Sequence, residues 1–359
     1  MFASYRHLMF ALLIVPIVSV LPVAAADPKP QEVWTDVNDP TLPADFAIQG
    51  EYSGDIDGAS TGCQVIALGN GAFQAVLFKG GLPGAGWDGQ NRSLLDGKLD
   101  GSTATFKPAE GTKKYIAGPA AEFSATDKFP PAGHQPYIAT ISGGKFTGKT
   151  ADGKLFTLSR LVRTSPTLGQ KAPSGAIILF DGSNTEEWKG GRLDEKTRLL
   201  NTDGKDILTN RKFTNYAMHV EFYLPYRPAA RGQGRGNSGF YQADLYEMQI
   251  LDSFGLEGKN NECGGIYTLA VPKVNMCLPP LQWQTYDVEF TSAVVGTDGK
   301  KTKPAVFTAR HNGVLIHDKL ELSGKTGGSR NEPEGTPGPI KLQGHGNPLQ
   351  FRNIWIVER

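Results

Sequence analysis

The sequence predicts an all-β protein of two domains, in which a jelly-roll β-sandwich follows a smaller antiparallel β domain, either a sandwich or a barrel. The chain has 359 residues, which is enough for two domains that each bury a core. Its 44 glycines and 24 prolines separate many short apolar–polar runs, a pattern typical of strands joined by tight turns. No segment has the periodicity of a convincing amphipathic helix.

The first 26 residues, 1–26, are expected to be a signal peptide. Arg6 precedes an apolar run over residues 9–20, and three alanines at 24–26 form a small-residue cleavage site. An uncleaved membrane anchor is the alternative, but the run is short for a bilayer span. We therefore expect a periplasmic or secreted protein, without a membrane span after cleavage, whose mature chain begins with a polar lead over residues 27–43.

Residues 44–163 are expected to form the small β domain, and residues 164–174 a linker. Short β-like runs separated by glycine cover residues 63–68, 73–78, 101–106 and 155–160. Asn70-Gly71, between the first two runs, is a strong hairpin signal. The segment 164–174 has the composition of a linker. The role of the small domain is left open by its sequence.

Residues 175–359 contain longer runs and are expected to form the jelly roll. The runs cover residues 176–180, 216–224, 240–251, 284–291, 305–310, 314–317, 340–343 and 349–357. Asn312-Gly313 predicts a hairpin between two of them. About eight to ten strands without a helix are typical of a two-sheet antiparallel sandwich.

The segment that begins at Tyr246 is the first candidate for chemistry. In an extended chain Tyr246, Met248 and Ile250 share an apolar face, which suits the core between two sheets. Glu247 and Gln249 then project from the opposite face. A buried carboxylate without a partner would be costly, which supports that orientation.

Four further polar residues are expected to join Glu247 on one concave sheet surface. Asn237 lies in the glycine-rich loop before this strand, Gln343 and His345 lie between two late strands, and Arg352 lies in the last strand. Amide, imidazole, guanidinium and carboxylate groups offer directional hydrogen bonds to a ligand rich in hydroxyls. We expect all five side chains to converge on one cleft.

The three cysteines predict one disulfide. Cys263 and Cys277 flank a short segment and are the natural pair in an exported protein, which leaves Cys63 as a buried thiol; three free thiols are the alternative. No ligand spacing predicts a zinc site and no nucleotide motif predicts an organic cofactor. A structural Ca²⁺ is compatible with the loop carboxylates, although no Asp-x-Asp-x-Asp-Gly loop marks one. The net charge of +1, without a basic stripe, argues against a nucleic-acid partner.

An ordered set of motifs in residues 175–359 resembles the 3-keto-disaccharide hydrolase domain family, formerly a domain of unknown function. The motifs are Leu179–Gly182 with Trp188, Asn237–Gly239, Tyr246–Asp252, Gly265–Tyr267, Trp283 with Tyr286-Asp287, Asn312-Gly313, Gly338–Gly346 and Phe351–Ile354. The resemblance implies a concanavalin-like lectin/glucanase jelly roll that acts on glycosides oxidised at C3. A ketone at C3 acidifies the C2 proton, so a general base can remove it, the C1 substituent is expelled by elimination, and water then adds.

The resemblance also implies roles for the candidate residues. Glu247 or His345 would be the base, and Asn237, Gln343 and Arg352 would be hydrogen-bond donors, with Gln249 beside them. Trp283 would be a stacking platform for the sugar ring. A separate oxidoreductase would supply the 3-keto sugar.

Two other functions stay open at this stage. A retaining glycosidase needs two carboxyl groups roughly 5 Å apart. The strand offers Glu247, but Gln249 stands where a second acid would be, and Asp252 falls on the other face. A non-catalytic lectin-like module is the second alternative, because a jelly roll does not fix a function.

Overall fold

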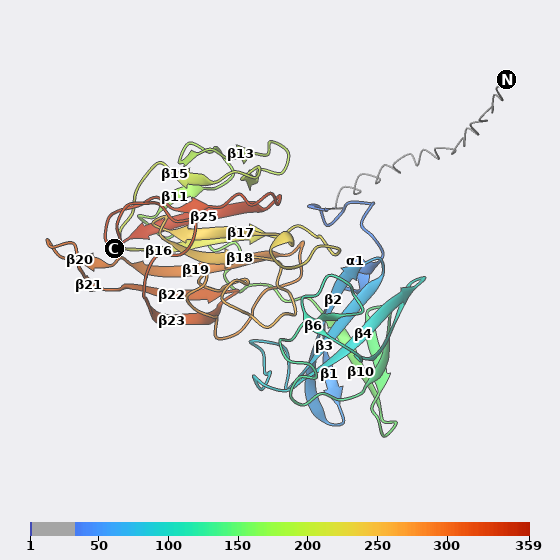
Figure 1. The fold of residues 1–359 in the computed structure, drawn as a ribbon. Coiled ribbons are helices and arrows are strands. Elements are labelled where there is room, and N and C mark those ends of the chain that lie inside the picture. The colour runs from blue at the N-terminus through green and yellow to red at the C-terminus, as the bar shows by residue number, and fades with distance from the viewer. Residues whose placement is uncertain (2–32) are drawn as a thin grey trace. The chain divides into compact units, whose positions relative to one another are not determined.

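The computed structural model describes Met1 and residues 33–359 (Figure 1). Apart from Met1, the predicted signal peptide and the first part of the polar lead lie outside the described residues. Within the described part of the chain, no helix is long and apolar enough to cross a membrane. The fold is nearly all β, as predicted, with α1 (Asp45–Ile48) as the one α-helix of the described residues.

The small domain is a closed antiparallel barrel, one of the two predicted forms. Its strands, in the order in which they pair around the barrel, are β1 (Gly50–Ile56), β10 (Leu155–Leu161), β9 (Lys145–Lys149), β8 (Ile138–Ser142), β5 (Thr103–Pro108), β4 (Arg92–Asp100), β3 (Ala72–Lys79) and β2 (Ala59–Gly69). Asn70 and Gly71 form the β2–β3 turn with positive φ angles of 54° and 68°, as the hairpin signal predicts. The parallel pair β6 (Lys114–Tyr115) and β7 (Phe123–Ser124) lies between β5 and β8 in sequence.

Alternation along β3 buries both faces of that strand. Phe73, Ala75 and Leu77 belong to the apolar cluster inside the barrel. Val76 and Phe78 belong instead to the cluster that forms the core of the second domain. Because the outward side chains of β3 are buried there, the barrel and the second domain share an apolar contact.

The second domain is the predicted two-sheet antiparallel sandwich. The eight-stranded sheet consists of β13 (Arg192–Leu193), β14 (Leu200–Asn201), β25 (Gln350–Glu358), β16 (Tyr216–Tyr223), β19 (Trp283–Thr291), β22 (Ala305–His311) and β23 (Val314–Leu322) in spatial order, with β11 (Ile177–Phe180) also paired to β25. The five-stranded sheet has the order β12 (Trp188–Lys189), β15 (Ile207–Thr209), β24 (Lys341–Leu342), β17 (Ser238–Gln242) and β18 (Tyr246–Ile250). Two smaller elements are the pair β20 (Val294–Val295) and β21 (Lys301–Lys303), and the 3₁₀ turn η1 (Gly232–Gly234).

Aromatic side chains from the two sheets meet in the core of the sandwich. The rings of Phe240 on β17 and Tyr286 on β19 stack at 6.4 Å, and Tyr246 on β18 lies 5.6 Å from Phe290 on β19. The inward faces of β17 and β18 are therefore apolar. Their outward faces are left for polar side chains, as the alternation of β18 predicts.

The expectation of one long strand over residues 240–251 is wrong. This segment forms a hairpin of β17 and β18, in which Ala243 and Asp244 turn the chain with φ angles of 48° and 52°. The turn lacks the usual Asn-Gly signal, and it is held from outside the hairpin. Lys341 forms a 2.7 Å ion pair with Asp244, and Arg330 donates a 2.9 Å hydrogen bond to the carbonyl oxygen of Ala243.

The segment predicted as a linker is fixed to the outer face of the eight-stranded sheet. Ser165 Oγ lies 2.6 Å from Thr285 Oγ1, and Thr167 donates a 2.7 Å hydrogen bond to Asp287. The amide of Gly169 donates a 2.6 Å hydrogen bond to the buried carboxylate of Glu221. We call residues 165–170, which lie within the predicted linker, the strap, because these bonds hold them against the sheet.

Candidate functional site

A polar pocket of about 300 Å³ lies on the outer face of the five-stranded sheet. Its lining residues are Gln233, Asn237, Tyr241, Glu247, Gln249, Tyr267, Gly327, Gly328, Gln343 and His345. The structure thus brings together five of the side chains selected from the sequence. They are Asn237, Glu247, Gln249, Gln343 and His345.

Glu247 is the one acidic residue that lines this pocket. It lies opposite Tyr241 in the β17–β18 register, and its Oε2 atom accepts a 2.8 Å hydrogen bond from the Tyr241 hydroxyl. The residue is only 3% exposed. Burial raises the pKa of Glu247 to about 7, although the bond from Tyr241 and the charge of Lys341 act in the opposite direction. A carboxyl group with this pKa exchanges a proton near neutral pH, as a general base must.

Tyr241 is placed to donate a proton in a hydrogen bond. Its hydroxyl lies 2.8 Å from Glu247 and 2.9 Å from the carbonyl oxygen of Gly327, and it accepts a 3.3 Å hydrogen bond from Gln343. Burial, with the nearby charge of Glu247, raises the pKa of Tyr241 far above its usual value, so the phenol stays protonated. The ammonium group of Lys341 lies 3.8 Å from the centre of the Tyr241 ring.

A group of amides forms another wall of the pocket. The side-chain oxygen of Gln233 accepts hydrogen bonds from Asn237 (2.9 Å) and Gln249 (3.3 Å). Asn237 is 1% exposed, and its Oδ1 atom has no hydrogen-bond partner among the described residues. Because a buried acceptor without a partner is costly, this oxygen is suited to a hydroxyl group of a ligand.

His345 lies at the exposed edge of the same pocket. Its loop is held by Asn347, which donates a 2.9 Å hydrogen bond to the His345 carbonyl oxygen. Of the two residues considered as the base, Glu247 is the buried one with a hydrogen-bonded partner.

The expectation that Arg352 and Trp283 join this cleft is wrong. Both belong to the eight-stranded sheet, where the Arg352 guanidinium lies 4.0 Å from the centre of the Trp283 ring. Arg352 also forms a 2.7 Å ion pair with Glu221, its cross-strand neighbour on β16. Phe222 and Phe351, next to these residues in sequence, point into the core. Arg352 and Trp283 therefore lie on the outer face of the other sheet, on the far side of the sandwich from Glu247.

The structure carries all three cysteines as buried free thiols. Cys263 Sγ lies 3.1 Å from the Tyr286 hydroxyl, and Cys277 Sγ lies 3.5 Å from the carbonyl oxygen of Leu251. Burial raises the pKa of Cys277. The predicted disulfide between Cys263 and Cys277 stays a prediction.

No group of three or more His, Cys, Asp or Glu side chains is arranged to hold a metal ion within residues 33–359. The structural Ca²⁺ considered from the sequence stays untested.

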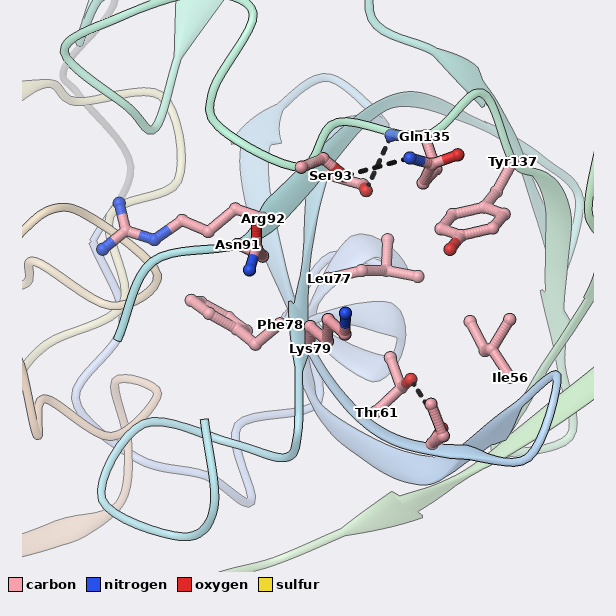
Figure 2. A pocket seen from close by; sticks show the side chains of 12 residues that line it. Ile56, Thr61, Leu77, Phe78, Lys79, Asn91, Arg92, Ser93, Gln135 and Tyr137 are labelled. Carbon is pink, nitrogen blue, oxygen red and sulfur yellow. Dashed lines mark hydrogen bonds between the residues drawn. The ribbon is translucent and has the colours of Figure 1, made fainter. Parts of the chain in front are cut away.

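A second cavity, of about 270 Å³, lies at one end of the barrel (Figure 2). Leu77 and Tyr137 contribute apolar surface to it, and Lys79, Ser93 and Gln135 contribute polar groups. None of its lining residues is a carboxylate or an imidazole. Of these two cavities, only the sandwich pocket is lined by a carboxylate or an imidazole that could remove a proton from a ligand.

Sequence reasoning missed four residues at or beside the pocket. Tyr241 and Lys341 were hidden by the unrecognised β17–β18 hairpin, because their positions relative to Glu247 depend on it. Tyr267 stands in the Gly265–Tyr267 motif, which was noted only as part of the resemblance. Gln233 lies in the glycine-rich loop that contains Asn237, and its side-chain amide was a signal that could have been used.

The family model described as "3-keto-alpha-glucoside-1,2-lyase-like domain" matches residues 175–357. With the β-sandwich and its polar pocket, this match defines a carbohydrate-active protein. The chain belongs to the 3-keto-α-glucoside-1,2-lyase-like family, as the resemblance of its motifs predicts. Among curated proteins, none matches the sequence.

Three crystal structures of proteins from Parabacteroides distasonis ATCC 8503, each described as a "putative glycosyl hydrolase", are similar to the chain. The first has 33% identity and a TM-score of 0.49, and the match covers 52% of this chain and 85% of that protein. The second has 20% identity and a TM-score of 0.39, with coverage of 55% and 98%. The third has 19% identity and a TM-score of 0.37, with coverage of 52% and 100%.

Proposed function

We propose that the protein cleaves 3-keto glycosides by elimination across C1 and C2, with Glu247 as the general base. The observation that carries this proposal is the pairing of Glu247 with Tyr241 in a buried polar pocket. Burial holds the pKa of the carboxyl at about 7, while the phenol remains a donor. Such a pair can accept a carbon-bound proton and stabilise the oxyanion that forms.

The first step is proton abstraction from C2. The C2–H bond breaks, its proton passes to the Glu247 carboxylate, and the electron pair forms an enolate whose charge lies on the C3 oxygen. The Tyr241 hydroxyl and the Gln343 amide are the O–H and N–H donors next to Glu247. Once Glu247 holds the proton, the Tyr241 O–H is released from the carboxylate, so we assign it and a Gln343 N–H to the enolate oxygen.

The second step is departure of the C1 substituent. The C3 carbonyl re-forms, a C1=C2 double bond forms and the C1–O bond breaks. The leaving oxygen takes the proton held by Glu247, which restores the base. Addition of water across the double bond then gives the free 3-keto sugar, so the whole sequence is a hydrolysis that needs no redox partner in this chain.

The amides of Gln233, Asn237 and Gln249 would bind the sugar hydroxyls and fix its orientation. This assignment rests on the buried free oxygen of Asn237 and on the bonds that orient the other two side chains. We further propose that a separate oxidoreductase oxidises the glycoside at C3, and that both proteins work outside the cytoplasm.

A retaining glycosidase has less support. It requires a second carboxyl roughly 5 Å from the first, and the described residues that line the pocket include no acid besides Glu247. A binding module without catalysis would not need a carboxyl whose pKa is raised to about 7 by burial.

The experiment compares 4-nitrophenyl 3-keto-α-glucoside with 4-nitrophenyl α-glucoside as substrates of the mature chain. We expect nitrophenol to be released from the keto compound only, and Glu247→Gln to lower kcat by roughly 100-fold or more. Glu289→Gln is the matched control. Glu289 belongs to the eight-stranded sheet, where it forms an exposed ion pair with Arg359. Equal rates on both glycosides would support the glycosidase, and saccharide binding without turnover would support the lectin-like module.

A further inference from the structure

Two loops that are bonded to residues lining the sandwich pocket are also attached to the barrel. The first runs from Pro228 to Gly236 and contains Gln233. The second runs from Glu257 to Glu262, and its Asn261 carbonyl oxygen accepts a 2.9 Å hydrogen bond from Gln233. The side chain of Gln233 therefore connects the first loop to the second.

Two arginines fix the first loop to the end of β2. Arg231 donates a 2.8 Å hydrogen bond to the carbonyl oxygen of Leu68, and Arg235 donates a 2.9 Å hydrogen bond to that of Ala67. Arg235 is 5% exposed, and its charge is balanced by a 2.6 Å ion pair with Asp252. These two residues flank η1, so the backbone on either side of Gln233 is held by the barrel.

The barrel approaches this loop closely at Gly69. A Cβ atom on Gly69 would lie 3.0 Å from the Cα atom of Ala229, and its φ of 84° already favours glycine. The contact between β2 and the loop is therefore a direct approach of two backbones.

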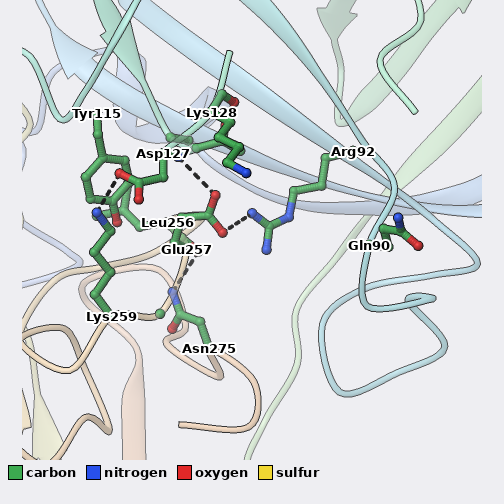
Figure 3. A network of polar contacts seen from close by, with 12 residues as sticks. Gln90, Arg92, Tyr115, Asp127, Lys128, Leu256, Glu257, Lys259 and Asn275 are labelled. Atoms are coloured by element: carbon green, nitrogen blue, oxygen red, sulfur yellow. Dashed lines mark hydrogen bonds and ion pairs between the residues drawn. The ribbon is translucent and has the colours of Figure 1, made fainter. Parts of the chain in front are cut away.

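The second loop is fixed to the barrel by charged side chains (Figure 3). Glu257 forms a 2.5 Å ion pair with Arg92 and accepts a 3.0 Å hydrogen bond from the amide of Asp127. Lys259 forms a 2.6 Å ion pair with Asp127, and its ammonium group lies 4.0 Å from the centre of the Tyr115 ring. The Tyr115 hydroxyl also donates a hydrogen bond to the buried carboxylate of Glu262, which Figure 3 does not label.

The second loop also continues into the edge of the pocket. The amide of Gly264 donates a 3.0 Å hydrogen bond to the carbonyl oxygen of Gln249, and the amide of Gln249 donates one of 2.8 Å to that of Gly265. A shift of this loop would therefore move the edge of β18 that carries Gln249.

We infer that the barrel is a positioning element of the sugar pocket, and that Gln233 is the substrate-binding residue through which it acts. Arg231, Arg235 and Glu257 are positioning residues, because they act on the pocket only through the two loops. Gln233 in turn orients the amides of Asn237 and Gln249. This inference rests on the proposed function, and it assigns to residues 44–163 a role in substrate affinity.

The test is Arg231→Met, which keeps the aliphatic length of the side chain and removes its donors to the barrel. With 4-nitrophenyl 3-keto-α-glucoside we expect KM to rise by roughly tenfold with kcat nearly unchanged, because binding is weakened and the Glu247–Tyr241 pair is not touched. Arg231→Lys should restore part of the affinity, since one donor returns. Gln233→Ala should reproduce the rise in KM.

Lys154→Met is the matched control on the barrel, because the Lys154–Asp57 ion pair is exposed and has no partner in the sandwich. It should leave KM unchanged. An unchanged KM in both Arg231→Met and Gln233→Ala would overturn the inference. So would a loss of kcat accompanied by a lower Tm, because that pattern indicates general destabilisation.

Hydrogen exchange separates this inference from the proposed function. Arg231→Met should speed exchange of the amides in residues 232–237 and 258–262, and leave the rest of β18 protected. Unchanged exchange in those segments would refute anchoring by the barrel. If the native chain fails to cleave the keto glycoside, the elimination is refuted and the exchange result still decides whether the barrel holds the loops.

Discussion

The Tyr241 hydroxyl lies 2.8 Å from Oε2 of Glu247, and the two residues face each other across paired strands. Each strand of the hairpin contributes one partner, so the distance between them is set by the spacing of the sheet. A pair held in this way is preorganised, because neither side chain depends on a mobile loop for its position.

The pH dependence of cleavage should follow the ionisation of Glu247. Its pKa of about 7 means that the required carboxylate is a minority form at lower pH. We expect kcat/KM to rise about tenfold per pH unit below pH 7 and to level off above it. Initial rates between pH 5 and 9 measure this, and a flat profile across that range would exclude Glu247 as the base.

Ionisation of Glu247 should lower the free energy of unfolding, although it activates the base. Folding raises the pKa of Glu247 from 4.5 to about 7. The contribution of this residue to stability is therefore complete below pH 4.5 and is lost as the pH rises through about 7. The variant Glu247→Gln cannot ionise and should gain about 3 kcal/mol over the native protein between those limits. Urea unfolding at pH 5 and pH 8 checks this, and an equal difference at both values would contradict it.

Tyr241→Phe should change both the rate and its pH dependence. Loss of the donor should lower kcat by roughly 100-fold, because the phenol is assigned to the enolate oxygen. The Tyr241 bond also lowers the pKa of Glu247, so its removal should move the pH midpoint upward. Tyr246→Phe is the control, because the Tyr246 hydroxyl bonds to Glu334 away from the pocket. If kcat falls and the pH midpoint does not move, Tyr241 stabilises the enolate but does not lower the pKa of Glu247.

Gly239→Ala should lower the rate of cleavage by displacing the Glu247 carboxylate. A Cβ at this position would lie 2.5 Å from Oε1 of Glu247 and 2.7 Å from the Tyr241 ring, closer than side chains approach. We expect the carboxylate to move and kcat to fall by at least about 100-fold. Gly324→Ala is the control, because nothing lies within 4 Å of its added carbon. Native activity in Gly239→Ala would mean that the position of this carboxylate is not critical.

The cysteine prediction is tested by counting thiols. Under denaturing, non-reducing conditions, a disulfide between Cys263 and Cys277 leaves one reactive thiol, that of Cys63. Three reactive thiols would refute the bridge and agree with the unbonded state of the structure.

The sequence predicted correctly which side chains of β18 face the core. It did not predict that β18 pairs with β17. Glu247 and Gln249 do point away from Met248 and Ile250, because side chains of a strand must alternate. The partner of Glu247 was not foreseen, since the turn at Ala243 and Asp244 has positive φ angles without glycine or asparagine. That turn depends on ion-pair and hydrogen-bond contacts with residues about 90 positions later, which local patterns do not reveal.

Arg352 shows a second limit of the same reasoning. Alternation indicates whether a side chain faces in or out, and it does not indicate which sheet the strand joins. A register shift between His219 and Glu221, opposite the positive φ of 46° at Asn353, also breaks the simple alternation of β25. As a result Arg352 and Asn353 both bond to Glu221.

The strap has a consequence for expression of the family domain alone. The family match begins at residue 175, but Glu221 and Asp287 take hydrogen bonds from residues 165–170. A recombinant fragment that begins at residue 175 would lack those donors, although Glu221 would keep its bonds to Arg352 and Asn353. We expect such a fragment to be less stable than one that begins before Ser165.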